Sequence, residues 1–231
     1  MEKYTIGQFN EYAPTTMDEA SLTVHAYTLW LNRTVGDAYA TASCVPGRVD
    51  NGSGALRDAS DPVSRQISNR TGMPWLNFKL QARLRNIPFD LLHCHSPFAT
   101  GQYALWMGRR RDIPVVATFH PGYCRDMLQS VRPSVAKRMT RRMIKFLSSV
   151  DEVWVPGAVA EETLRKYGYR GRVIMMENAP DMEKNTFDTV RNRYITVIRR
   201  KKCELLHRKS RTPWPERIWP DPIFELSEQL A

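Results

Sequence analysis

Residues 89–120 constrain the fold of this chain more than any other stretch of its sequence. An apolar run at 89–94 ends at a turn signal, Ser96-Pro97, and a helix-length segment separates it from a second apolar run at 113–119. This order predicts one βαβ unit. Strands of a parallel sheet are buried on both faces, and both runs are accordingly almost continuous in apolar residues rather than alternating.

Polar side chains follow the two predicted strands. His95 and Ser96 come at the end of the first strand, and His120 comes directly after the second. The carboxyl ends of parallel strands meet at one edge of a sheet, and open α/β proteins bind their ligands at that edge. We therefore expect these three side chains to face a common crevice.

The rest of the chain continues the alternation of strands and helices. We expect further strands at residues 4–9, 38–45, 151–155 and 173–176, and helices at 18–36, 77–85, 133–149 and 158–167. Residues 48–74 are rich in Gly, Ser, Asp and Asn with little periodicity and predict a surface loop, and for residues 121–126 we expect a loop that runs into helical sequence. About six strands alternating with helices indicate an α/β fold with a doubly wound, mostly parallel, Rossmann-like sheet.

The net charge of +10 is concentrated in two basic stretches. Residues 132–145 carry six Lys or Arg and no acid, and residues 191–211 carry nine against the single acid Glu204. The first stretch lies on a predicted helix, where its cations either form a solvated face or bind anionic lipid headgroups. The candidates for membrane or anion binding are Arg138, Arg141, Arg142 and Lys145. For residues 199–211 we expect a disordered charged segment without nucleic-acid binding, because aromatic residues are not interleaved with the charges.

The sequence argues against disulfide bonds, a metal site and a membrane-spanning helix. The four cysteines lack paired or metal-like spacing, which indicates a reducing compartment. His93 and His95 are two residues apart but have no carboxylate or cysteine partner at a diagnostic spacing, so we expect no metal site and a His93 packed against a helix. No apolar run reaches the ~18 residues of a spanning helix. We expect a cytoplasmic protein, at most peripheral on the inner face of the membrane.

The order of five segments resembles the N-terminal half of a family-4 glycosyltransferase with the two-domain GT-B architecture. They are FDLLHCHSPF, IPVVATFH, DEVWVP, AEETLRKYG and RVIMMENAPD, within a resemblance that covers residues 4–185. The resemblance implies retaining transfer of a hexose from a nucleotide-sugar donor to a lipid, glycan or small-molecule acceptor, without a cofactor or metal. It also implies that residues 1–185 form the acceptor-binding domain that lines the interdomain cleft.

The resemblance assigns roles to residues at or after strand ends. His120 matches the cleft histidine that contacts the donor sugar, and it is the implied catalytic residue. Asn178 stands at the turn into the interdomain linker, where Ala179 replaces the usual glycine. The implied substrate-binding residues are Thr15, Thr16, His95, Ser96, Tyr123 and Asn178.

Two departures from the family pattern concern donor binding. The loop after the first strand usually has adjacent glycines whose backbone amides approach the donor phosphates, whereas residues 14–20 contain no glycine and two acids. Residues 186–231, a divergent basic and Trp-Pro tail, are too few for the donor-binding domain that the family places there. We therefore expect a truncated chain that is weakly active or inactive alone. The alternative is a non-catalytic membrane-surface or polyanion-binding protein derived from this fold.

Overall fold

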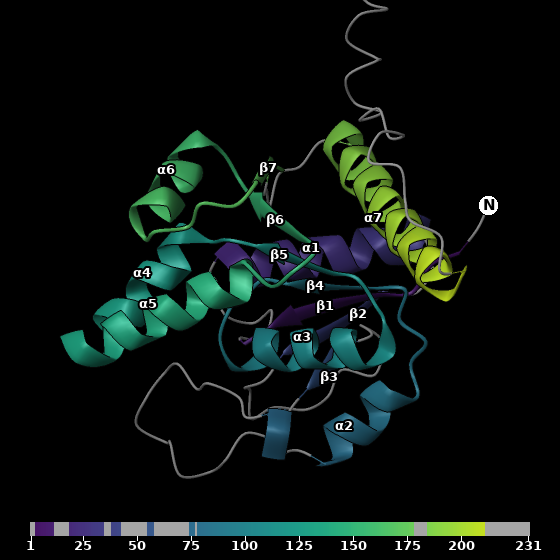
Figure 1. Cartoon of the computed structure of the whole chain (residues 1–231), viewed down its shortest axis with the longest axis horizontal. Coiled ribbons are helices and arrows are strands. Elements are labelled where there is room, and N and C mark those ends of the chain that lie inside the picture. The colour runs from purple at the N-terminus through teal and green to yellow at the C-terminus, as the bar shows by residue number, and fades with distance from the viewer. Residues whose placement is uncertain are drawn as a thin grey trace, which may run out of the picture.

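The computed structural model describes residues 3–11, 19–34, 38–42, 55–57, 74–76, 78–177 and 184–210. These residues form a seven-stranded sheet of order β3-β2-β1-β4-β5-β6-β7 in which every neighbouring pair is parallel (Figure 1). The strands are β1 (Ile6–Asn10), β2 (Ala38–Ala42), β3 (Ala55–Arg57), β4 (Leu91–Cys94), β5 (Val115–Thr118), β6 (Glu152–Val155) and β7 (Ile174–Met175). The helices are α1 (Glu19–Thr34), η2 (Pro74–Leu76), α2 (Phe78–Arg85), α3 (Ala99–Arg111), α4 (Pro121–Gln129), α5 (Pro133–Leu147), α6 (Ala158–Lys166) and α7 (Lys184–Ser210).

The predicted α/β fold and the central βαβ unit are confirmed, with two local corrections. The strand β3 lies inside the stretch predicted as a loop, where it pairs with β2 through Ala42 and Arg57. Its three residues are too few to produce a periodic signal. The helix α4 begins at Pro121, directly after His120, where a loop was expected, because proline is favoured at the first position of a helix.

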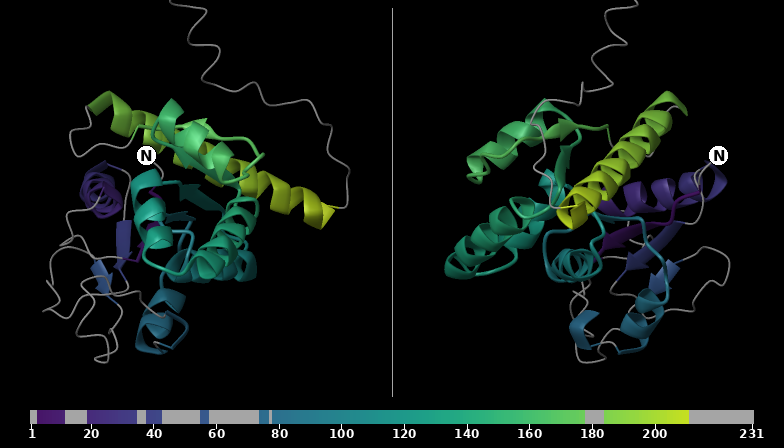
Figure 2. Two further views of the ribbon diagram at one scale, coloured as in Figure 1. Left: turned by 90° about the vertical axis from the view of Figure 1, so that its left-hand side faces the viewer. Right: turned by 45° about the vertical axis from the view of Figure 1, so that its right-hand side comes forward.

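Alternation along the strands divides the interior into two apolar clusters. Leu92 and Val115 point to the face covered by α2, α3, α5 and α6, whereas Leu91, Val116 and Trp154 point to the face covered by α1 and α7. The views of Figure 2 show helices on both sides of the sheet, with α1 and α7 together on one side. Both faces of the sheet are covered, as a parallel sheet requires.

The prediction of a disordered charged segment at residues 199–211 is wrong for residues 199–210, which belong to the helix α7. Residues 199–210 are helical, and α7 buries Val190, Tyr194, Val197 and Ile198 against the sheet. These positions repeat at the spacing of an amphipathic helix, which makes α7 part of the folded body. Although α7 has 27 residues, no helix of the described chain is long and apolar enough to cross a membrane.

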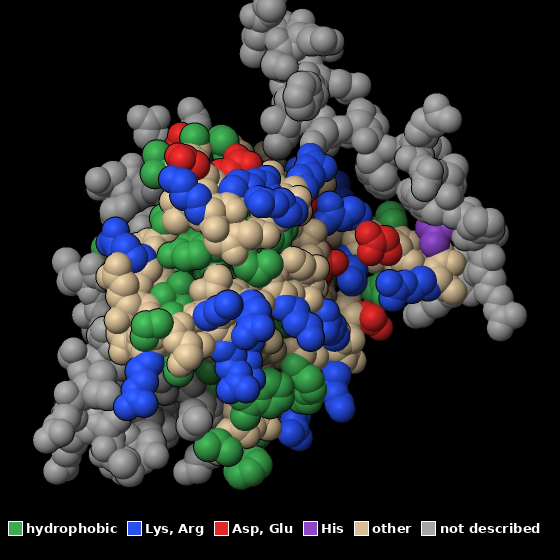
Figure 3. All heavy atoms as spheres, turned by 60° about the vertical axis from the view of Figure 1, so that its left-hand side comes forward, with side chains coloured by type: hydrophobic (Ala, Val, Ile, Leu, Met, Phe, Trp, Pro, Cys, Tyr) green, Lys and Arg blue, Asp and Glu red, His purple; other side chains and the backbone are tan. Residues whose placement is uncertain are grey.

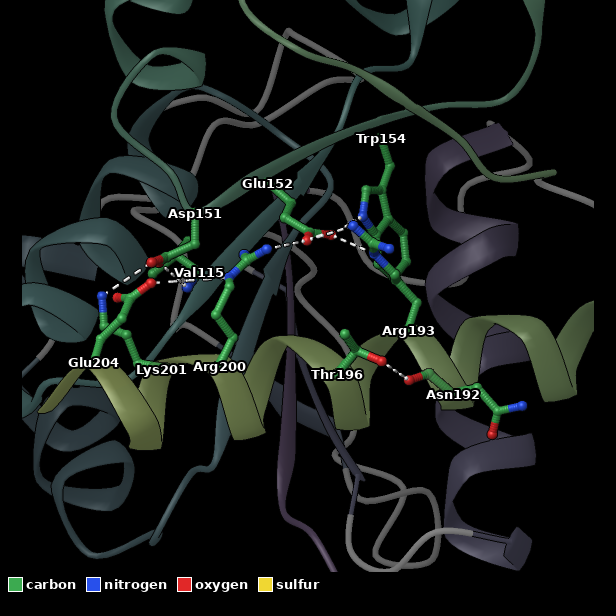
Figure 4. A network of polar contacts seen from close by, with 10 residues as sticks. All are labelled: Val115, Asp151, Glu152, Trp154, Asn192, Arg193, Thr196, Arg200, Lys201 and Glu204. Atoms are coloured by element: carbon green, nitrogen blue, oxygen red, sulfur yellow. Dashed lines mark hydrogen bonds and ion pairs between the residues drawn. The ribbon is translucent and has the colours of Figure 1, made fainter. Parts of the chain in front are cut away.

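Three cationic side chains of α7 pair with acids on strand β6 or on the residue before it (Figure 4). Arg193 makes two hydrogen bonds to the buried Glu152, at 2.8 and 2.9 Å, and Arg200 makes a third at 2.9 Å. Lys201 pairs with Asp151 at 2.9 Å. These pairs fix how α7 lies across the sheet.

Candidate active site

Polar side chains replace apolar ones on the α1 and α7 face as the strands approach their carboxyl ends. The register aligns Gln8 with His93, and the residues two positions further along the chain continue on the same face. The buried polar side chains of this row are Gln8, His93, His95, Thr118 and His120. Tyr194 reaches the row from α7 and hydrogen-bonds Gln8 and His93.

His95 joins the ends of three neighbouring strands. Its Nδ1 lies 3.1 Å from Nε2 of His120, and its Nε2 lies 2.8 Å from Oε1 of Gln8. The amide oxygen can only accept, so His95 donates from Nε2, and its Nδ1 accepts from Nε2–H of His120. This assignment follows from the orientation of the Gln8 amide, whose Nε2 donates to the hydroxyl of Tyr194 at 3.1 Å.

His93 is held by two hydroxyl groups. Its Nδ1 contacts the hydroxyl of Tyr194, and its Nε2 lies 2.7 Å from Oγ1 of Thr118. The ring also packs edge to face with Trp154, at 4.9 Å between centroids. His93 is therefore packed against a helix, as predicted from the sequence, and both of its ring nitrogens have partners.

Burial sets the protonation of this row. Desolvation lowers the pKa of His93 and of His95 well below the usual histidine value, and charge repulsion between the rings lowers both further. Desolvation also raises the pKa of Tyr194 well above its usual value. At pH 7, His93 and His95 are neutral and Tyr194 keeps its proton, so the hydrogen bonds that join Gln8, His93, Thr118 and Tyr194 link neutral groups.

Two helices begin at the same edge of the sheet. His120 is the N-cap residue of α4, and Ser96 lies in the turn before α3, where its Oγ accepts a hydrogen bond from N–H of Phe98 at 3.2 Å. The buried carboxylate of Glu11 accepts from N–H of Thr100 in the first turn of α3, at 3.1 Å. A carboxylate is stabilised at a helix N-terminus, and here it occupies a position that could otherwise serve a phosphate.

Glu11 was missed by the sequence reasoning. The signal available was an acid directly after a buried strand, beside Asn10. Asn10 is itself fixed by its side chain, which donates to Oγ of Ser21 on α1 at 3.0 Å. The loop after β1 therefore starts from two anchored polar residues.

The structure brings together only some of the predicted substrate-binding residues. His95 and His120 are in contact, and Ser96 is beside His95 in the chain, but all three side chains are buried. Tyr123 lies in the first turn of α4. Thr15, Thr16 and Asn178 lie outside the described residues. The crevice shared by Ser96 and His120 stays a prediction.

The basic candidates on α5 lie on a different face of the molecule. Arg138, Arg141, Arg142 and Lys145 are exposed, and Figure 3 shows Lys and Arg side chains gathered on this face. Arg142 and Lys145 line a groove of about 390 Å³ between α5 and α3, opposite Arg109. Among the described residues, no group of three or more His, Cys, Asp or Glu could hold a metal ion.

Comparison with known proteins places this arrangement in a family. The model of Glycosyltransferase Family 4 matches residues 37–184, which is more than half of the 231 residues. The chain belongs to glycosyltransferase family 4. This family-4 chain is also 32% identical over 85 residues to the alpha-monoglucosyldiacylglycerol synthase of Streptococcus pneumoniae (strain ATCC BAA-255 / R6). The aligned segment covers 34% of this chain and 18% of that protein.

Proposed function

We propose that this chain is the acceptor-side half of a retaining, nucleotide-sugar-dependent hexosyltransferase of the GT-B type. The observation that carries the proposal is the contact between His95 and His120 at the carboxyl edge of a parallel sheet, within a family-4 match. In such sheets this edge is the usual ligand-binding edge. By analogy with the name of its relative, a lipid such as diacylglycerol is the first acceptor to test.

In the proposed mechanism, His120 acts on the donor sugar through its second ring nitrogen. Nε2–H of His120 is directed at His95, and we propose that Nδ1, the other ring nitrogen, accepts a hydrogen bond from a sugar hydroxyl once the donor has bound. His95 is in turn fixed by Gln8, which makes it a positioning residue. Fixed dipoles of this kind stabilise charge that develops at a reacting sugar.

The proposal makes two demands on the rest of the system. His120 is 1% exposed, so its ring must be uncovered before a sugar binds. Glu11 occupies the N-terminus of α3, so this helix end is not open to the leaving diphosphate, and we propose that groups outside this chain hold it. Both demands lead us to propose that the isolated chain transfers sugar slowly or not at all.

A transfer assay tests the proposal. The chain, alone and mixed with a separately produced donor-binding half of a family-4 relative, is supplied with labelled nucleotide-linked glucose and diacylglycerol. We expect transfer on mixing that is lost in His120→Ala and kept in His207→Ala, a control on α7. Failure of every mixture, or loss of transfer only in variants that also unfold, would leave His120 as a structural residue and overturn the proposal.

A second candidate function is attachment to an anionic surface without catalysis. It is favoured by α5, which exposes Lys137, Arg138, Arg141, Arg142 and Lys145 and has no acidic residue. A basic amphipathic helix of this kind binds acidic headgroups through charge and is weakened by salt. Salt-sensitive vesicle binding with no turnover in any mixture would favour this function over sugar transfer.

A further inference from the structure

A cluster of mostly aromatic side chains, near the groove between α3 and α5, is the largest gathering of exposed hydrophobic side chains in the described structure. The described residues include eight exposed large hydrophobic side chains, and four of these lie on η2, α2 and α3. The four are Trp75 (44% exposed), Leu76 (67%), Phe78 (78%) and Trp106 (36%). We name them the aromatic cluster. Exposed clusters of this kind mark interaction sites.

The aromatic cluster is ordered by packing against α3. The ring of Trp75 meets those of Trp106 and Tyr103 edge to face, with centroids 5.2 and 5.1 Å apart. Leu76 and Phe78, at the ends of η2 and α2, extend beyond this contact and are the most exposed members. The two Trp rings are thus half covered, while Leu76 and Phe78 are presented outward.

Cations lie beside the aromatic cluster, on α3 and in the groove between α3 and α5. The guanidinium of Arg110 lies 5.0 Å from the ring centroid of Trp106, a cation–π contact. The next residue back, Arg109, lines the groove of about 390 Å³ together with Arg142 and Lys145. The described lining of this groove contains no Asp or Glu, and Leu105 and Phe146 supply its apolar wall. Figure 3 shows the Lys and Arg side chains above a group of hydrophobic side chains on one face.

We propose that this face docks on an anionic phospholipid bilayer, with Leu76 and Phe78 inserted at the level of the upper acyl chains. Trp rings favour the interfacial region, and Arg and Lys bind headgroup phosphates at the same depth. The groove is large enough to receive one such phosphate between α3 and α5. A nucleic acid would match the cations but would leave Leu76 and Phe78 without an apolar partner.

This inference rests on the second candidate function, the attachment through α5, and adds the apolar side chains that insert and the side of the molecule that meets the bilayer. It does not depend on sugar transfer. The carboxyl-edge histidines are buried on the α1 and α7 face, whereas α3 and α5 cover the opposite face of the sheet. Docking would therefore leave the transfer edge free to act.

Co-sedimentation of the full chain with vesicles tests the inference. We expect binding to phosphatidylcholine vesicles that contain one third phosphatidylglycerol, and little binding to phosphatidylcholine alone. The charge variant Arg142→Ser/Lys145→Ser should weaken the partition coefficient about 30-fold, since each basic residue contributes about 1 kcal/mol at such a surface. The apolar variant Leu76→Ser/Phe78→Ser should weaken it by about tenfold or more.

Two control variants test whether the loss of binding is specific to the proposed docking face or follows the loss of any exposed apolar or basic side chains. Val159→Ser/Leu206→Ser removes side chains of 78% and 65% exposure elsewhere, and Arg170→Ser/Arg199→Ser removes two exposed cations elsewhere. Both controls should bind as the parent chain does. If only the charge variant weakens binding, attachment through α5 stands and the bilayer-inserting face is overturned. Absence of binding to either vesicle, or binding to an oligonucleotide alone, also overturns it.

Discussion

Glu152→Gln tests whether one carboxylate holds α7 on the sheet. Each oxygen of Glu152 accepts two hydrogen bonds: Oε1 from Arg193 and Arg200, and Oε2 from Arg193 and Trp154. A glutamine has nearly the same shape but carries an NH₂ group in place of one oxygen. Whichever position that group takes, it faces two N–H donors (Figure 4).

The expected cost follows from burial. The side chains of Arg193 and Glu152 are 6% and 4% exposed, so solvent cannot replace the lost charge. Breaking a buried ion pair from one side costs about 3–5 kcal/mol, because the remaining charge is left without a counter-ion. For a chain of this size, that loss corresponds to roughly 10 °C in the unfolding midpoint.

Urea unfolding followed by tryptophan fluorescence measures the loss. Glu204→Gln is the matched control, because Glu204 is 48% exposed and lies 4.0 Å from Arg200, where an ion pair contributes about 0–1 kcal/mol. We also expect trypsin to cleave α7 faster in Glu152→Gln than in the control. A loss below about 1 kcal/mol in Glu152→Gln, or an equal loss in both variants, would refute the reasoning.

Three further predictions concern the interior. Because burial lowers the pKa of His93 and His95, the unfolded chain takes up protons below about pH 6.5 while the folded chain does not, so stability should fall as the pH drops from about 7.5 to 5.5. A free energy of unfolding, measured with urea, that does not change with pH over this range would contradict this prediction. Tyr194→Phe should cost about 1–3 kcal/mol, since it removes one hydrogen bond from each of two buried side chains, Gln8 and His93, and an unchanged stability would disprove that role. Gly101→Ala places a Cβ 1.9 Å from the backbone oxygen of Ser96 and should cost about 3 kcal/mol or more by thermal unfolding. Gly122→Ala meets nothing within 4 Å and should be neutral or stabilising, and equal effects of the two would contradict the packing argument.

The βαβ unit was predictable because its signals are local. The apolar runs before His95 and His120 are long enough to be buried on both faces, and the strand-end rule then brings those two histidines to one edge. The structure places their rings 3.1 Å apart. What the rule could not give is the orientation of His95, since this depends on Gln8, which lies 87 residues away and in turn donates to the hydroxyl of Tyr194.

The prediction of disorder in the second half of α7 was wrong because it was based on the excess of Lys and Arg there and not on the spacing of the apolar residues. A run of cations without nearby acids reads as a solvated tail, but the acids that neutralise it, Asp151 and Glu152, are 41 to 50 residues away. An apolar stripe was nevertheless present at residues 190–198, at the spacing of an amphipathic helix. The spacing of apolar residues in this stripe predicts the helix better than the charge does, because it identifies the side of the helix that must be buried.

The docking of α7 has a consequence for the carboxyl edge. The hydroxyl of Tyr194 accepts from the Gln8 amide, which turns Oε1 of Gln8 toward His95, and this sets Nδ1 of His95 as the acceptor for His120. A sequence with the same strand-end histidines but no residue in the place of Tyr194 would lose this fixed order of donors and acceptors. The proposed orientation of His120 toward a sugar therefore depends on a helix that follows the family match in the chain, and the effect of Tyr194→Phe on transfer should exceed that of a variant of equal stability elsewhere.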